Sequence, residues 1–293
     1  MSTPPVSVVV VTYKREAILR QTLTHLLELT YQPREIIVVD QTAQHEPETA
    51  RFLALHAGCL RVIRLDRPSM THARNVGARA ARGEFVLYCD DDTIPPPQLI
   101  ERHLANYTAP DVAGVTGGIM GLKPGPAAPR ACVVRRDGKL LPFWEHTVPR
   151  GEVDSLLGCN MSWRRAVLLR AGGFDEGFIG RANWEETDLS LRVRRRGYRL
   201  LYDPAAAVVH LMAPDGGSRA PGRHSARYRY ESHYNNAYFF AKHFSARYLP
   251  AFLKREVGWI VVKRGLLKRE PEMILPALHG LMDGYRAGRR GQA

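Results

Sequence analysis

Residues 84–92 read EFVLYCDDD, a hydrophobic run that ends in three consecutive aspartates, Asp90, Asp91 and Asp92. The run from 84 to 89 is nearly continuous in large apolar residues rather than alternating, which is typical of a strand covered on both faces of a parallel sheet. Ligands of open α/β sheets bind outside the carboxyl ends of the strands. The stretch therefore predicts a buried parallel strand that delivers three carboxylates to a ligand-binding edge.

The sequence before this strand repeats an alternation of strands and helices. Three more runs rich in Val, Ile and Leu predict strands at residues 6–13, 35–40 and 60–65. Apolar residues at helical spacing lie between the strands, at residues 18–27, 52–55 and 70–80. Such alternation indicates an α/β protein with a mostly parallel, Rossmann-like sheet flanked by helices.

The pattern loosens after the three aspartates. A helix is expected to follow Pro95–Pro97, and a glycine-rich strand to occupy residues 112–119. Residues 121–153 are rich in Pro, Gly and Arg and predict a long irregular excursion, which in compact domains is often functional. Ordered elements are expected again at residues 155–163, 164–171, 184–196 and 199–202.

The last quarter of the chain differs in character. Residues 225–293 hold thirteen Lys and Arg against five Asp and Glu, a net charge of +8, with aromatic residues between the cations. Two or three amphipathic helices are expected there. The sequence thus predicts a catalytic domain at residues 1–224 and a basic helical extension at 225–293.

Composition restricts the partners and the compartment. The net charge of +13 suits an anionic substrate, a nucleic acid or an acidic membrane surface. The four cysteines form no CxxC pair, so neither a zinc site nor a disulfide framework is predicted. The apolar run at 257–262 is far shorter than the ~20 residues of a spanning helix. We expect a cytoplasmic protein with at most peripheral contact at the inner face of the cell membrane.

The three aspartates predict a divalent metal site. Clustered carboxylates repel one another, and a bound Mg²⁺ or Mn²⁺ relieves this while it also holds substrate phosphates. His210 ends the apolar run 205–209 and is a plausible partner of Asp92, because imidazole is a good ligand for Mn²⁺. The alternatives are a solvated acidic turn and a structural histidine.

Other polar residues share the predicted edge and suit a nucleotide. Thr12, Tyr13 and Arg15 end the first strand, and Arg74 and Asn75 lie on the helix before the aspartates, where a guanidinium could approach a diphosphate.

Asp40 ends the second strand, and its carboxylate could accept hydrogen bonds from a nucleobase or a ribose, or could cap a turn. No GxGxxG or GxxxxGK[ST] motif occurs, so phosphate binding is expected to run through a metal.

A second acidic group begins the helix predicted at 184–196. Glu185, Glu186 and Asp188 lie near its N-terminus, where the helix dipole favours the ionised form of a carboxylate that serves as a base. The alternative is a surface helix with ordinary Glu and Arg pairs.

Taken in order, these motifs resemble the family 2 glycosyltransferases with the GT-A fold. The similarity covers about residues 5–211. It rests on the VVD that ends at Asp40, on ARNVGARAARGEFVLYCDDD, and on GCNMSWRR, GGFDEGF and WEETDLSLRVRRRGYRLLYDP further along the chain.

The resemblance implies roles for the donor-side residues. Asp40 matches the aspartate that contacts the nucleotide base. Asp90, Asp91 and Asp92 match the DxD region, whose last acid holds the metal while an earlier one contacts the ribose. His210 matches a histidine that completes the metal site.

The resemblance also implies roles on the acceptor side. Glu185 and Glu186 match an acidic pair whose second member is the catalytic base, with a glutamate here where aspartate is usual, and Asp188 is the fallback. Gly158, Cys159 and Asn160, with Trp184, correspond to the pocket for the donor sugar and the acceptor.

The implied reaction is inverting transfer of a sugar from a nucleotide diphosphate sugar (UDP, dTDP or GDP) to a hydroxyl of a glycan, a lipid-linked or a small-molecule acceptor. Bacterial polysaccharide or glycoconjugate biosynthesis is the implied setting. The base and the metal then lie on opposite sides of the sugar.

Three alternatives remain open at this stage. The charge and the Tyr- and Arg-rich residues 223–234 suit a nucleic-acid binding module, although clustered acids would repel phosphates. A metal-dependent nucleotidyltransferase would need a Gly-rich, Lys-containing loop that is missing after the first strand. Residues 225–293 either dock on an anionic membrane or only pack on the catalytic domain.

Overall fold

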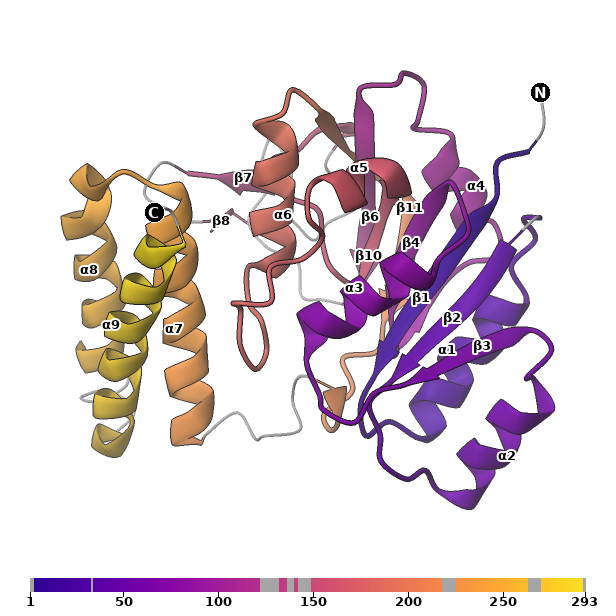
Figure 1. Ribbon diagram of the computed structural model, residues 1–293, viewed down its shortest axis with the longest axis horizontal. Coiled ribbons are helices and arrows are strands. Elements are labelled where there is room, and N and C mark those ends of the chain that lie inside the picture. The colour runs from indigo at the N-terminus through magenta and orange to yellow at the C-terminus, as the bar shows by residue number, and fades with distance from the viewer. Residues whose placement is uncertain are drawn as a thin grey trace.

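The computed structural model describes residues 3–32, 34–121, 132–135, 140–141, 149–217, 225–262 and 270–291 (Figure 1). Within these residues a nine-stranded mixed sheet has the order β3-β2-β1-β4-β10-β6-β11-β5, with β9 paired to β11. A bundle of three helices, α7, α8 and α9, stands beside it. This α/β sheet with flanking helices and a helical C-terminal region confirms the predicted fold class.

The first half of the chain alternates strands and helices as expected. Its strands are β1 (Val6–Thr12), β2 (Arg34–Asp40), β3 (Leu60–Arg64), β4 (Phe85–Asp90) and β5 (Thr93–Ile94). Its helices are α1 (Ala17–Leu27), α2 (Pro47–Leu55), α3 (Met70–Ala80) and α4 (Leu99–Leu104).

The second half completes the sheet and adds the bundle. Its strands are β6 (Val112–Met120), β7 (Val133–Val134), β8 (Leu140–Leu141), β9 (Gly151–Glu152), β10 (Asn160–Arg164) and β11 (Arg199–His210). Its α-helices are α5 (Arg165–Arg170), α6 (Glu185–Arg194), α7 (Ala226–His243), α8 (Leu249–Gly258) and α9 (Ile274–Arg290).

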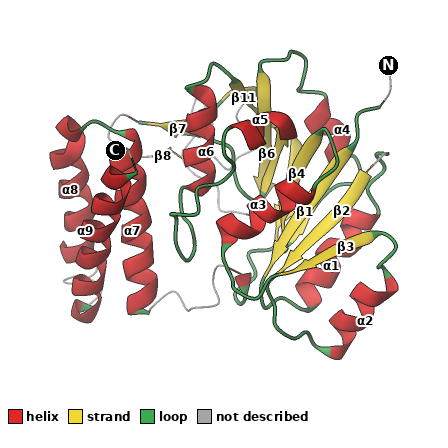
Figure 2. Cartoon of the chain, in the orientation of Figure 1, coloured by secondary structure: helices red, strands yellow, loops and turns green. Residues whose placement is uncertain are grey.

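Strand register brings several predicted site residues to one edge of the central sheet, whose strands are yellow in Figure 2. Strands β1, β2, β3 and β4 are parallel, and Thr12 pairs with Asp40 while Val11 pairs with Asp90. Strand β10 runs antiparallel between β4 and β6, so its first residue, Asn160, pairs with Cys89. The carboxyl end of β4 therefore meets the beginning of β10.

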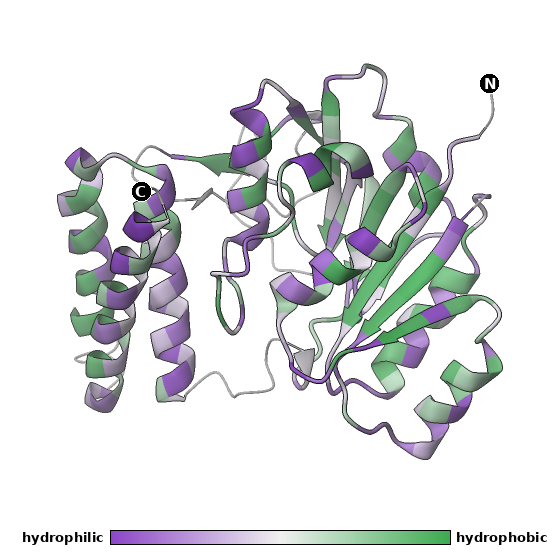
Figure 3. Ribbon diagram, viewed as in Figure 1, coloured by the Kyte–Doolittle hydropathy of each residue, from purple (hydrophilic) through white to green (hydrophobic). Residues whose placement is uncertain are grey.

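Alternate residues of the central strands fill two separate hydrophobic cores. Val8 and Val10 of β1 pack against α1, α2 and α4, whereas Val9 packs against α3, α5 and α6. Figure 3 shows the strands as the most hydrophobic part of the molecule. Burial on both faces explains why these strands read as continuous rather than alternating hydrophobic runs.

Strand β11 is longer than the sequence indicates. A strand is expected only at residues 199–202, because Pro204 interrupts the run, yet β11 continues to His210. Its pairing with β6 shifts register between Asp203 and Val208, and such an irregularity accommodates a proline within a strand. The continuation pairs His210 with Thr93 and so places the imidazole beside the aspartates.

Helices α7 and α9 pack at close range. Gly280, Gly284 and Gly288 lie in one row on α9 at four-residue spacing. A Cβ on any of them would collide with the α7 backbone. Only glycine permits this approach. The three helices fall within the expected extension; the boundary proposed at 224/225 adjoins residues 218–224, which lie outside the described part of the chain, and it stays a prediction.

Two further expectations concern the thiols and the membrane. All four cysteines are free in the structure. Within the residues described, none of the helices combines the length and the apolar character that crossing a bilayer would require. Most of the excursion predicted at 121–153 lies outside these residues.

Candidate active site

A cavity of about 340 Å³ opens at the carboxyl edge of the sheet. Its walls combine the end of β1, the aspartate cluster, His210 and residues from α7. Of the predicted site residues, the following line this cavity: Thr12, Tyr13, Arg15, Asp90, Asp91, Asp92 and His210.

Two carboxylates and one imidazole converge on this wall. The Nε2 atom of His210 lies 3.7 Å from Oδ2 of Asp90 and 3.6 Å from Oδ1 of Asp92. The other carboxylate oxygen of Asp92 accepts a hydrogen bond from the backbone N–H of Ala213 at 3.0 Å. That bond fixes the Asp92 side chain with one oxygen turned toward the imidazole.

This donor set fits a divalent cation. Carboxylate oxygens with an imidazole nitrogen suit Mn²⁺, and a cation would relieve the repulsion between Asp90 and Asp92. The Sγ atom of Cys159 also lies within 4.8 Å of ligand atoms of Asp90 and His210. Burial first, and then the neighbouring carboxylates, raise the pKa of Cys159 well above its usual value, so the thiol stays protonated. Asp90, Asp92 and His210 are therefore the candidate ligands, and Asp90 joins the pair expected from the sequence.

Asp91 points away from this trio, toward β1. Its carboxylate accepts a hydrogen bond from the Thr12 hydroxyl at 2.7 Å and lies 3.6 Å from Nε of Arg15. Burial raises the pKa of Asp91 to about 7, and Arg15 and Thr12 offset part of that rise. Arg15 also approaches Asp92 at 3.4 Å, so one guanidinium steadies two of the three aspartates.

Arg74 joins the two acidic groups that are distant in sequence. From α3 it pairs with Glu185 at the start of α6, lies 3.5 Å from Asp90, and donates to the carbonyl oxygen of Gly158 at 3.1 Å. A Cβ at Gly158 would collide with the guanidinium. Both acidic groups therefore belong to one region, and Glu185 is neutralised by its partner.

Glu186 has the properties expected of a base. It is only partly buried, next to the paired Glu185 in the first turn of α6. Burial raises the pKa of Glu186 and the charge of Asp90 adds to the rise, while Arg74 opposes it. A carboxylate with a raised pKa is a better proton acceptor at neutral pH.

The Asp188 side chain is fully buried. It is 0% exposed and receives hydrogen bonds from Arg192 at 2.8 Å and from His243 at 2.7 Å, with Lys242 at 2.6 Å. These cationic partners outweigh burial and hold the pKa of Asp188 far below its usual range. A fully enclosed carboxylate cannot reach an acceptor hydroxyl, so Glu186, the least buried of the three predicted acids, stays the candidate base; none of the three lines the cavity described above.

Asp40 sits at the predicted edge but outside the cavity wall. It is fully buried, and its oxygens accept hydrogen bonds from the N–H of Thr42 at 2.9 Å and from His45 at 2.8 Å. Arg64 lies 2.6 Å from the same carboxylate. Contact with a base would require one of these partners to move; the neighbouring residue Gln41 lines the cavity instead.

Two predicted site residues serve the scaffold. Asn75 binds the backbone of Phe174 through both ends of its amide, at 2.8 Å each. Asn160 is fully buried, donates to the carbonyl oxygen of Ala206 at 2.7 Å and pairs with His103 at 2.9 Å. Neither amide faces the cavity, because buried amides require partners within the core. Trp184 also lies off the cavity, packed against α7.

Sequence reasoning missed a group of residues on the cavity wall. These are Lys14, Gln41, Ser69, Arg181, Arg227 and Glu231. Arg181 is held by Tyr228, whose ring lies 5.0 Å from the guanidinium carbon. Arg181 follows an irregular loop and Arg227 begins α7, so no strand-end or periodic pattern connects them with the aspartates.

Comparison with known proteins agrees with this geometry. Residues 7–147 match the family described as Glycosyl transferase family 2. The pre-mycofactocin glycosyltransferase of Mycobacterium tuberculosis is 29% identical over 207 residues, which cover 70% of this chain and 42% of that protein. This chain thus spans less than half the length of that relative.

Two solved structures share the fold at low sequence identity. The Pyrobaculum calidifontis mannosyltransferase PcManGT, in complex with GDP-Man and Mn²⁺, has a TM-score of 0.56 and 20% identity and covers 98% of this chain and 76% of its own. GalNAc-T7 with UDP, GalNAc and Mn²⁺ has a TM-score of 0.67 and 17% identity, and the match covers 92% of this chain and 54% of the GalNAc-T7 chain. Residues 7–147 thus carry the sequence pattern of glycosyl transferase family 2, and the chain has the fold of these GT-A glycosyltransferases.

Proposed function

We propose that the protein is an inverting, metal-dependent glycosyltransferase that moves a sugar from a nucleotide diphosphate donor to an acceptor hydroxyl. The supporting observation is the convergence of Asp90, Asp92 and His210 on one cavity wall, with Arg74 linking Asp90 to Glu185, the residue next to the candidate base Glu186.

The donor diphosphate would lie at the aspartate wall. A divalent ion held by Asp90, Asp92 and His210 supplies charge neutralisation for the diphosphate as it leaves. Lys14 and Arg181 line the same cavity and can bind phosphate oxygens. Two structures with the same fold contain Mn²⁺ together with GDP-Man or with UDP and GalNAc, which supports a nucleotide sugar and a metal here.

Glu186 would take the proton of the acceptor hydroxyl as its oxygen attacks the anomeric carbon. The new bond forms on the face opposite the departing diphosphate, so a single displacement inverts the anomeric centre. Arg74 pairs with Glu185 and lies near Asp90, and thereby keeps the acid groups in fixed relative positions. We place the reaction in bacterial glycan or glycoconjugate biosynthesis.

A donor screen tests this function. Melting temperatures would be measured with UDP-, GDP- and dTDP-sugars, each with Mn²⁺ or Mg²⁺, because a ligand that binds only the folded state raises the melting temperature. We expect one nucleotide to give the largest rise, and only with metal. The anomeric configuration of the product, read by proton NMR, should be opposite to that of the donor. Retention would overturn the inverting mechanism.

We also propose that the helical extension docks on an anionic membrane, where a lipid-linked acceptor would lie. Four of the seven exposed large hydrophobic side chains of the described residues fall there: Leu253, Val262, Leu275 and Met282. Exposed cations flank them on α8 and α9, among them Lys254, Arg286, Arg289 and Arg290. Apolar residues among cations match the two attractions of an acidic bilayer surface.

Replacing Leu253, Leu275 and Met282 together by Ser should lower binding to phosphatidylglycerol vesicles about tenfold or more. Each inserted side chain contributes up to about 1.5–3 kcal/mol. The measurement is co-sedimentation with vesicles, and Leu55→Ser is the matched control, since Leu55 is 79% exposed on α2 at a distance from the bundle. Equal binding by the triple variant and the control would remove the membrane proposal.

A further inference from the structure

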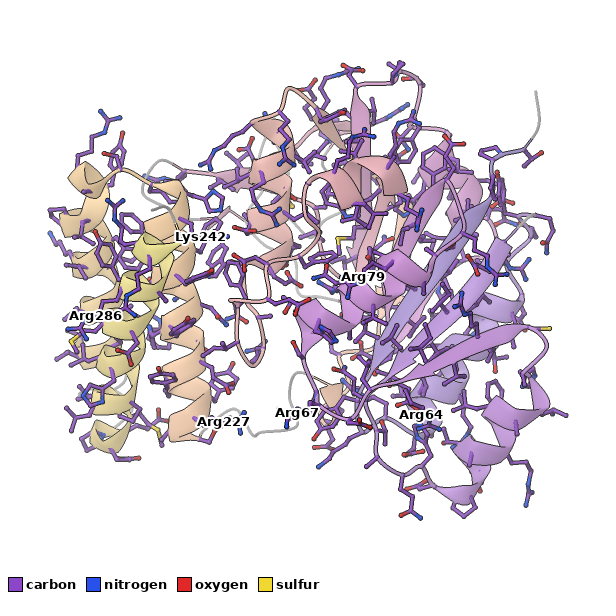
Figure 4. All side chains as sticks on the ribbon, in the orientation of Figure 1. Arg64, Arg67, Arg79, Arg227, Lys242 and Arg286 are labelled. Carbon is purple, nitrogen blue, oxygen red and sulfur yellow. The ribbon has the colours of Figure 1, made fainter. Side chains whose placement is uncertain are left out.

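Helix α7 contacts the turn of α6 that carries Glu185 and Glu186. Contacts are made on both sides of this pair, at Trp184 before it and at Asp188 after it. Figure 4 shows Lys242 on the side of α7 that faces the sheet domain. The extension thus holds the chain two residues before and two residues after the candidate base Glu186.

The first contact fixes the residue that starts α6. Trp184 has a φ of 81°, in the left-handed region that non-glycine residues rarely adopt. Its ring stacks on Phe239 with 5.1 Å between centroids and 6° between planes, and its Nε1–H donates to Oδ1 of Asn236 at 2.7 Å. Such a backbone conformation persists where surrounding contacts determine it, and here α7 supplies them.

The second contact fixes the end of the same turn. Oδ1 of Asp188 forms an ion pair with Nζ of Lys242 at 2.6 Å and accepts a hydrogen bond from Nε2 of His243 at 2.7 Å; both residues lie in the last turn of α7. Arg192, on α6 itself, binds the other oxygen at 2.8 Å. Because Asp188 is fully buried, loss of its α7 partners would leave a buried charge with less compensation.

The same face of α7 also holds the segment that leads into α6. Asn235 exchanges two hydrogen bonds with the backbone of Ile179, at 2.8 and 3.0 Å. Tyr238 donates to Asp175 at 2.9 Å, and Lys242 binds that carboxylate as well as Asp188. The approach to α6 and its first turn are therefore held as one unit.

We propose that α7 positions the catalytic base, with Trp184 and Asp188 as positioning residues that transmit its contacts to Glu186. The inference rests on the proposed function. A reacting group displaced by about 1 Å can lose a hundredfold in rate, and an unsupported first turn of a helix frays easily. The helical extension is then part of the catalytic apparatus and not only a docking module.

The test combines Lys242→Met with His243→Leu, which removes both α7 donors to Asp188. We expect kcat to fall about tenfold or more while the donor KM changes less than about twofold. Lys242→Arg and His243→Gln, which keep a donor, should restore most of the rate. Arg51→Met is the control, because Arg51 is exposed on α2 and does not line the cavity.

A second readout follows the turn itself. Amide hydrogen exchange at residues 185–190 should be faster in the double variant and unchanged in the control. Asn236→Ala removes the acceptor of Trp184 and a donor to Glu256 on α8 but keeps both α7 contacts to Asp188. It is a milder variant that should show both effects more weakly if the double variant fails to fold.

A folded double variant with unchanged kcat and unchanged amide exchange would overturn the inference. A loss of kcat/KM that comes entirely from a higher donor KM would also overturn it. Absence of transfer by the wild-type protein with every donor would instead overturn the proposed function. In that case the exchange measurement still decides whether α7 holds the turn.

Discussion

Asp92→Asn is expected to lower kcat by about a thousandfold or more. The substitution keeps the shape of the side chain and an acceptor for the Ala213 N–H, but it removes the negative charge beside His210. Without that charge the site holds a cation weakly, and several kcal/mol of stabilisation on the leaving diphosphate are lost, at about 1.4 kcal/mol per factor of ten. The measurement is sugar transfer at saturating donor across a Mn²⁺ titration.

The control for this variant is Asp111→Asn, at an exposed carboxylate that pairs with Arg199 far from the cavity. It should keep wild-type activity. Removal of metal by EDTA should inactivate the wild-type protein, and added Mn²⁺ should restore it. Full activity of Asp92→Asn in metal-free buffer would contradict the ligand assignment.

Glu186→Gln is expected to lower kcat by a factor of about 10²–10⁴, the usual contribution of a general base. The donor KM should stay near that of the wild-type protein, because Glu186 acts on the acceptor and the metal group stays intact. Glu185→Gln is the informative comparison: it loosens the Arg74 pair without removing the proton acceptor, so its kcat should fall less. Steady-state kinetics with both substrates varied measure the two effects.

The pH profile gives an independent check on Glu186. The base works in its deprotonated form, and burial raises its pKa above the usual glutamate value. Activity should therefore decline, as pH falls, at a higher pH than an ordinary glutamate would give, and it should be retained above that pH. If the activity of Glu186→Gln declined at the same acidic pH as that of the wild-type protein, the decline would belong to another titrating group.

Local sequence was sufficient for the first four parallel strands and for the residues that end them. Continuous hydrophobic runs identify strands buried on both faces, and the rule that ligands bind at carboxyl ends then brings Thr12 and Asp90 to one edge. His210 was expected there only as a possible metal ligand together with Asp92, because Pro204 hides the continuity of β11. These predictions succeed because strand direction and register follow from the residues themselves.

The remaining features depend on contacts between distant segments. Nothing near Asp40 in sequence indicates that Arg64 would cover its carboxylate. Asp188 reads as an ordinary member of an acidic helix start, yet α7, more than fifty residues later, encloses it through His243. Such partners are set by tertiary packing of helices whose surfaces offer many polar pairings, and one sequence alone does not select among them.

The most direct test of the central claim is calorimetric titration of the wild-type protein with its nucleotide sugar. The titration is run once in buffer with Mn²⁺ and once in buffer with EDTA instead of Mn²⁺. The account predicts tight binding with Mn²⁺ and a loss of about a hundredfold or more without it, and the same loss in Asp92→Asn even with Mn²⁺. Equal donor affinity under both conditions would contradict it.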